Sequence, residues 1–164
     1  MKKLIMMSAA AGTGKSTYIR QYMEKHGVCD VISSDETRKK LTGAYDDFSI
    51  PGIQKLVYED FWKQSEELVK KEDCTVFIDC ACLLNRVRQK IVNHCPGYDC
   101  YELVMIHKPL DVVLKQNTMR DACRVVPEEV VKSMWESFEL PDEETSALFS
   151  SIIYIDESGE KKWK

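Results

Sequence analysis

The chain lacks most of the features that would assign it to a membrane, fibrous or nucleic-acid-coating class. Its 164 residues include no apolar run of about 18 residues, the length that crosses a membrane as a helix. It contains only seven glycines and five prolines, and no repeat or low-complexity tract. With 23 basic and 27 acidic side chains, it has no positive excess of the kind found in permanent nucleic-acid coats. These absences favour one ordinary globular domain over residues 1–164.

The seven cysteines are odd in number, and their spacing fits no structural zinc site. Cys80 and Cys82 are the closest pair, and on a strand their side chains would share one face. A metal site or redox pair is one interpretation of this pair. We favour free, buried thiols in a reducing cytoplasm. The N-terminal residues resemble a signal peptide, but the apolar stretch is only residues 4–7. We therefore expect a cytoplasmic protein.

Apolar runs alternate with amphipathic segments along the chain. The patterns predict strands at 3–8, 28–33, 75–79, 101–107 and 151–156, and helices at 15–25, 36–41, 53–71, 85–93, 111–119 and 127–139. In the third helix, the expected buried stripe is Ile53, Leu56, Val57, Phe61 and Leu68. Continuous apolar strands between helices are typical of an α/β fold, with a parallel sheet covered on both faces. Ligands bind such a sheet at the carboxyl ends of its strands.

The clearest functional motif follows the first predicted strand. Residues 9–16 (AAAGTGKS) match the P-loop pattern except at the first position, where Ala9 replaces glycine. Backbone N–H groups of such a loop, and of the helix after it, surround nucleotide phosphates. Lys15 is expected at the β- and γ-phosphates of ATP and Ser16 on Mg²⁺. The full set expected to bind ATP here is Gly12, Thr13, Gly14, Lys15, Ser16 and Thr17. No Asn-Lys-x-Asp guanine motif is present, which leaves small kinases and regulatory ATPases.

A second motif ends the second predicted strand, at residues 33–38 (SSDETR). Asp35 and Arg38 are three residues apart, so a helix directs both side chains into one crevice. Asp35 is expected to accept the proton of an attacking hydroxyl, and Arg38 to bind an anionic group on that substrate. The alternative is that Ser34 or Asp35 caps the helix. Beside a P-loop, we favour the catalytic interpretation.

Three further polar residues follow later elements. Asp79 ends an apolar strand in a Walker-B-like pattern, which predicts a contact with the Mg²⁺ shell; the alternative is a turn former. Arg120 and Arg124 lie in a segment expected to form a lid over residues 117–127. Arginines on such a lid would stabilise charge on the nucleotide phosphates when it closes. The alternative for these arginines is solvated loop charge.

These motifs together resemble the phage-type polynucleotide 5′-hydroxyl kinase domain, within a P-loop group that also includes zeta-toxin-like kinases and AAA-type ATPases. The matching segments are 12–17, 34–38, 78–79, 85–86, 117–120 and 126–127. The resemblance implies that Asp35 is the general base, that Arg38 binds a phosphate beside the target hydroxyl, and that Arg120 is a lid arginine on the ATP phosphates. It also implies a P-loop kinase fold with a five-stranded parallel sheet in the order 2-3-1-4-5, so that the Asp79 strand lies beside the P-loop strand.

The sequence therefore predicts a phosphotransferase that uses ATP and Mg²⁺ and acts on a hydroxyl. The leading acceptor is the 5′-OH end of DNA or RNA, and no membrane partner is expected. The alternatives are a small-molecule kinase for a nucleoside, sugar or antibiotic, and a P-loop ATPase switch without a hydroxyl acceptor. The acidic net charge favours a small molecule. The polynucleotide is favoured by the basic side chains of Arg38, Lys39, Lys40, Arg86 and Lys90.

Overall fold

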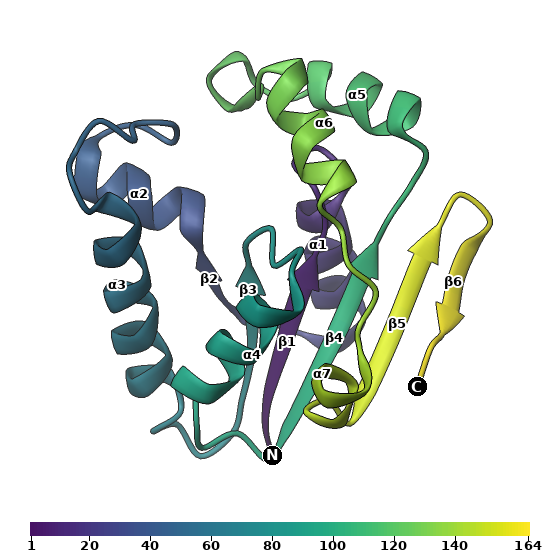
Figure 1. The fold of residues 1–164 in the computed structure, drawn as a ribbon. Coiled ribbons are helices and arrows are strands. Elements are labelled where there is room, and N and C mark those ends of the chain that lie inside the picture. The colour runs from purple at the N-terminus through teal and green to yellow at the C-terminus, as the bar shows by residue number, and fades with distance from the viewer.

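A six-stranded sheet runs through the centre of the computed structural model, which describes all 164 residues (Figure 1). The strands, in spatial order, are β2 (Asp30–Ser33), β3 (Cys74–Asp79), β1 (Lys2–Ser8), β4 (Cys100–Ile106), β5 (Ser151–Asp156) and β6 (Gly159–Lys162). The first five are parallel, which confirms the predicted order 2-3-1-4-5 and the position of β3 beside β1.

The prediction of five strands needs one correction, because β6 pairs antiparallel with β5 at the edge of the sheet. All four residues of β6 are exposed and none is a large apolar residue, so no hydrophobic pattern marks this strand. The chain reverses at Asp156, whose carboxylate accepts a 2.8 Å hydrogen bond from the Ser158 N–H and pairs with Lys161 at 2.9 Å. The hairpin is thus specified by turn chemistry.

Helices cover both faces of the sheet, as expected. They are α1 (Lys15–His26), α2 (Ser34–Thr42), α3 (Ile53–Leu68), α4 (Asn85–His94), α5 (Leu110–Thr118), α6 (Glu128–Glu136) and α7 (Glu143–Ala147), with a 3₁₀ turn at Ala122–Arg124. Six of these helices match predicted ones with ends shifted by a few residues, whereas α7 and the 3₁₀ turn were not predicted. None of the helices is long and apolar enough to cross a lipid bilayer.

The central strand β1 is buried on both faces, which explains its unbroken apolar sequence. Leu4 and Met6 pack with α3 and α4, while Ile5 and Met7 point to the opposite face and pack with Ile19 of α1. Period-two alternation therefore divides β1 between two cores. In Figure 1, α5 and α6 lie beyond the carboxyl ends of the strands.

The buried face of α3 differs from the predicted stripe. Ile53, Val57, Phe61 and Ser65 are buried, at a spacing of four residues, whereas Leu56 is 43% exposed. Successive side chains on a helix are rotated by about 100° around its axis. When Val57 points into the core, Leu56 therefore points to the side of the helix. The helix also ends at Leu68 rather than at residue 71.

Aromatic stacking attaches α6 to the end of β4. The His107 ring stacks on Trp135 and Phe138, with centroids 5.0 and 4.3 Å away, and the Trp135 indole donates a 2.7 Å hydrogen bond to the Lys108 carbonyl. Burial lowers the pKa of His107. Trp135 and Phe138 thus serve to pack the end of α6 against the end of β4.

Candidate active site

A cleft of about 1170 Å³ opens at the carboxyl ends of the strands, where the fold class predicts a ligand site. The polar part of its wall comes from four segments that lie far apart in the sequence. These are the loop before α1, the start of α2 with the loop after it, the loop after β3, and residues 117–127, which we call the lid segment. Every residue predicted to act in catalysis or to bind nucleotide or metal lines this cleft.

The loop before α1 has the backbone of a phosphate cradle. Gly12 and Gly14 have φ angles of 77° and 106°, which only glycine adopts readily. A Cβ at Gly12 would also lie 2.9 Å from the Cα of Asn117. Helix α1 starts at Lys15 with no side-chain cap, so its first N–H groups face the cleft without a side-chain acceptor. These groups suit a bound anion.

Ala9 fits this loop without strain, because Cys82 is the single non-glycine residue with a positive φ. The departure from the P-loop pattern at position 9 is therefore conformationally neutral. The Ala9 N–H donates to the Ala81 carbonyl at 3.0 Å, and its own carbonyl accepts a 3.2 Å bond from the Lys15 ammonium. Thr13 turns its hydroxyl inward to the Ala10 carbonyl, at 2.7 Å, so only its backbone can face a nucleotide.

The capping alternative for Ser34 and Asp35 is wrong, because Ser33 caps α2. The Ser33 hydroxyl accepts a bond from the Glu36 N–H at 3.3 Å, and α2 begins at Ser34 instead of residue 36. Asp35 thus lies in the first turn, and its carboxylate is 42% exposed in the cleft. The capping role does not compete for this carboxylate, so it is available for chemistry.

Arg38 is positioned beside Asp35 as expected, but it is almost fully buried. Its side chain is 7% exposed, and Nη1 donates to Asp35 Oδ1 at 3.1 Å and to the Tyr45 carbonyl at 2.7 Å. The guanidinium also lies 4.2 Å from the centre of the Phe48 ring. Much of this guanidinium therefore serves to hold the loop after α2, and its binding of a substrate anion stays a prediction.

Asp79 and Ser16 supply hard oxygen donors at the same edge of the sheet. Asp79 ends β3, which lies between β1 and β2, and its register partner on β2 is Ser33. Ser16 is exposed in the first turn of α1. A hydroxyl and a carboxylate suit Mg²⁺, which completes its octahedral shell with phosphate oxygens and water. The residues present therefore fit the expected metal.

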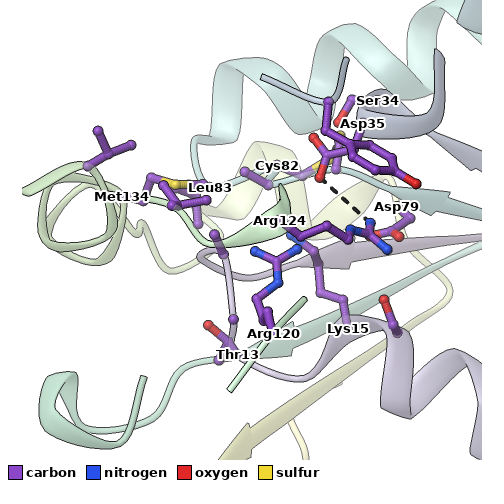
Figure 2. Close-up of a pocket in the computed structure, with 18 of the residues that line it drawn as sticks. Thr13, Lys15, Ser34, Asp35, Asp79, Cys82, Leu83, Arg120, Arg124 and Met134 are labelled. Atoms are coloured by element: carbon purple, nitrogen blue, oxygen red, sulfur yellow. Dashed lines mark hydrogen bonds and ion pairs between the residues drawn. The ribbon is translucent and has the colours of Figure 1, made fainter. Parts of the chain in front are cut away.

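Arg120 and Arg124 bring two cations from the lid segment toward these carboxylates, and Figure 2 shows both arginines with Lys15, Asp35 and Asp79. Burial and the neighbouring Arg124 cation lower the pKa of Arg120, while Asp35 and Asp79 raise it. These opposing influences indicate that the lid arginines and both carboxylates act on one another within the cleft. An arginine remains charged under these conditions.

Asn117 holds the two ends of the lid segment together. Its amide nitrogen donates to the Val126 carbonyl at 2.7 Å, and its amide oxygen accepts from the Val126 N–H at 3.1 Å. Because Asn117 also lies against Gly12, the base of the lid segment is packed on the phosphate cradle. The motif at residues 117–120 contains this asparagine, but no pattern in the sequence indicates the clamp.

Arg88 was missed altogether, although it is fully buried. Its guanidinium donates to Ser8 Oγ at 2.9 Å and to the carbonyls of Cys82 and Leu83 at 2.9 and 3.1 Å. Arg88 thereby ties the end of β1 to the loop after β3. Its spacing of three and four residues from buried Ile91 and Val92 is the signal that could have placed it on the core face.

The side of the cleft remote from the cradle is largely apolar. The contributing side chains come from α3, the loop before α4, α4 itself and α6: Tyr58, Leu83, Leu84, Val87, Val130 and Met134. Figure 2 shows Leu83 and Met134 on this side. Cys80 and Cys82 lie beneath it, with sulfurs 2.7 Å apart and both thiols free.

Comparisons with known proteins match this arrangement. The family model of the AAA domain matches residues 4–141. The L-seryl-tRNA(Sec) kinase of Methanococcus maripaludis is 26% identical over 147 residues, which cover 84% of this chain and 53% of that protein. The chain thus spans about half the length of this curated relative.

Two solved structures share the fold at lower identity. A gluconokinase from Sinorhizobium meliloti 1021 superposes with a TM-score of 0.63 at 19% identity, over 94% of this chain and 82% of the other. A chain of the Pnkp1/Rnl/Hen1 RNA repair complex gives a TM-score of 0.71 at 18% identity, over 91% and 46% of the two chains.

Proposed function

Because the chain belongs to the AAA domain family and has a P-loop kinase fold, we propose that it transfers the γ-phosphate of ATP to a hydroxyl group. The leading acceptor is the 5′-hydroxyl end of a polynucleotide. One observation carries the proposal: the half-exposed carboxylate of Asp35 opens into the same cleft as the phosphate cradle. A nucleotide-driven switch has no need of a base at that position.

The residues of the cleft divide the work of in-line transfer. Backbone N–H groups of residues 12–17 hold the phosphates, and Lys15 exchanges the Ala9 carbonyl for the β- and γ-phosphate oxygens. Ser16 and Asp79 would hold Mg²⁺, which supplies positive charge to the same oxygens. Asp35 accepts the proton of the attacking hydroxyl, the new O–P bond forms, and the bond to the ADP oxygen breaks. Arg120 stabilises the charge on the transferring group.

Two features of the acceptor side support a nucleic-acid end over a sugar. Arg38 and Arg124 lie beside Asp35, where a phosphate next to the acceptor hydroxyl would be held. The remote wall offers apolar and aromatic surface that suits the face of a base, whereas a sugar needs many hydrogen-bond partners. The names of two similar proteins, a seryl-tRNA kinase and an RNA repair complex, also refer to RNA.

The test is transfer of label from γ-³²P-ATP with Mg²⁺ to a panel of acceptors. The panel contains 5′-OH DNA and RNA oligonucleotides, the same oligonucleotides with 5′-phosphates as matched controls, a serylated tRNA, nucleosides, and gluconate with other sugars. We expect label on the 5′-OH oligonucleotides and none on the 5′-phosphorylated ones.

Other outcomes select an alternative. Label only on a nucleoside or sugar indicates a small-molecule kinase, and label on the seryl group indicates a tRNA-linked acceptor. ATP hydrolysis without any labelled acceptor indicates the ATPase switch.

A further inference from the structure

One arginine of the lid segment reaches across the cleft to the acceptor side. Arg124 Nη2 lies 3.9 Å from Asp35 Oδ2, and its guanidinium lies 4.8 Å from the centre of the Tyr45 ring. Figure 2 marks the contact between Arg124 and Asp35. Both partners belong to α2 and the loop after it, and neither belongs to the phosphate cradle.

The position of Arg124 is set by the clamp at the base of the lid segment. Arg124 is two residues from Val126, which Asn117 holds by two hydrogen bonds. The Arg124 N–H also donates to the Asp121 carbonyl at 2.7 Å. A short, closed turn therefore presents this side chain to the cleft, and its contact with Asp35 is a consequence of local geometry.

The guanidinium of Arg124 retains unused donors. Its Nε is buried without a hydrogen-bond partner, and 3.9 Å is too long for a hydrogen bond to Asp35. A guanidinium offers five N–H donors in a planar fork that matches two oxygens of a phosphate. Arg38 Nε is also buried without a partner, but Arg38 Nη1 already donates to Asp35 and to the Tyr45 carbonyl. The Arg38 side chain is also only 7% exposed, against 27% for Arg124. Arg124 is therefore the freer cation beside the base.

We propose that Arg124 selects the acceptor by binding an anionic group, such as a phosphate, next to the reactive hydroxyl. This inference rests on the proposed function and changes the role predicted for Arg124 from the nucleotide to the acceptor. In the empty cleft Arg124 forms a long ion pair with Asp35 Oδ2. When the acceptor enters, Arg124 moves to the phosphate and Asp35 Oδ2 is released to face the hydroxyl, while Oδ1 stays bonded to Arg38. Acceptor recognition and release of the base are then one event.

Binding is the first arm of the test and needs no turnover. Calorimetry measures Kd for thymidine 3′-monophosphate, thymidine and ATP with Mg²⁺, in the wild type, Arg124→Ala, Arg124→Lys and Arg20→Ala. Arg20→Ala is the control, because it also removes one arginine, from an exposed position of α1 outside the cleft. We expect Arg124→Ala to reduce the preference for the 3′-phosphate by about tenfold, with ATP binding within about twofold. The preference of Arg124→Lys should lie between those of the wild type and Arg124→Ala, because lysine keeps the positive charge but cannot donate two parallel hydrogen bonds.

Kinetics supply the second arm. For Arg124→Ala, kcat/KM on thymidine 3′-monophosphate should fall about tenfold, mostly through KM. On thymidine it should fall much less, because thymidine carries no phosphate for Arg124 to bind. If Arg124 only supported the fold, its loss would reduce kcat/KM on both acceptors and not on the 3′-phosphate alone.

Equal losses of kcat/KM on both acceptors, or ATP binding weakened about tenfold in Arg124→Ala, would overturn the inference. So would a wild type that binds thymidine and its 3′-phosphate equally. A wild type that prefers the 3′-phosphate through Arg124 but transfers nothing to it would contradict the proposed acceptor and support the anion site.

Discussion

The two halves of the cleft are built in different ways. The phosphate cradle is backbone, and two residues that precede it, Ser8 and Ala9, are fully buried. The Ala9 N–H donates to the Ala81 carbonyl, and Ser8 Oγ donates to the Cys82 carbonyl. The acceptor side consists of charged and aromatic side chains on α2, the loop after it and the lid segment, where Phe48 is 55% exposed. The generic part of the reaction is thus placed in rigid backbone, and the selective part in side chains that can rearrange.

The largest effect is expected in the cradle, from Lys15→Ala. Lys15 is the cationic side chain of the cradle itself, and water cannot replace its charge at the β- and γ-phosphates, so kcat for phosphoryl transfer should fall roughly a thousandfold. Lys15 makes one hydrogen bond to the protein, to the Ala9 carbonyl, so the melting temperature should change little. Lys25→Ala, on an exposed position of the same helix, is the control. Normal turnover in Lys15→Ala would remove the cradle from the mechanism.

Rigidity of the cradle side is tested by Arg88→Met. The substitution leaves the carbonyls of Cys82 and Leu83 buried without this donor, which should cost about 3 kcal/mol of unfolding free energy. Urea unfolding measures the loss. Arg86→Met, on an exposed position of the same helix, should stay within about 0.5 kcal/mol. If Arg88→Met were as stable as Arg86→Met, the cradle side would not be held more rigidly than the acceptor side.

On the acceptor side, Asp35→Asn should separate chemistry from folding. The amide cannot take the hydroxyl proton, so kcat should fall about a hundredfold. Because Ser33 caps α2, the melting temperature and the ATP affinity should remain near those of the wild type. Asp46→Asn removes another carboxylate that lines the cleft and serves as the control. If both variants kept full turnover, Asp35 would not be the base.

The smallest effect should come from Ser33→Ala. Losing the bond to the Glu36 N–H should reduce the unfolding free energy by about 1 kcal/mol. Ser34→Ala should change it by less than about 0.5 kcal/mol, since Ser34 makes no cap. Chemical denaturation of the two variants decides which serine starts the helix. A larger loss in Ser34→Ala would contradict the cap.

The same contrast explains what the sequence could predict. The five parallel strands and the cradle were predicted from apolar runs and contiguous motifs, whereas the strand order and the position of the Asp79 strand were implied by the resemblance to the polynucleotide kinase domain. The contact of Arg88 with Ser8 and the contact of Arg124 with Asp35 each join residues far apart in the chain. No local sequence pattern contains either pair. The sixth strand has no apolar residue to mark it, and the choice of Ser33 over Ser34 depends on where the preceding strand ends.

The clamp made by Asn117 has a consequence for how the length of the chain can vary. Since Asn117 and Val126 are bonded to each other, the residues between them form a loop whose two ends stay together whatever its length. Each doubling of such a loop costs only about 0.6 kcal/mol in closure entropy. Insertions between positions 118 and 125 can therefore change the part of the lid segment that faces the acceptor and leave the sheet and the cradle unchanged. This makes the lid segment the natural place to engineer a different acceptor.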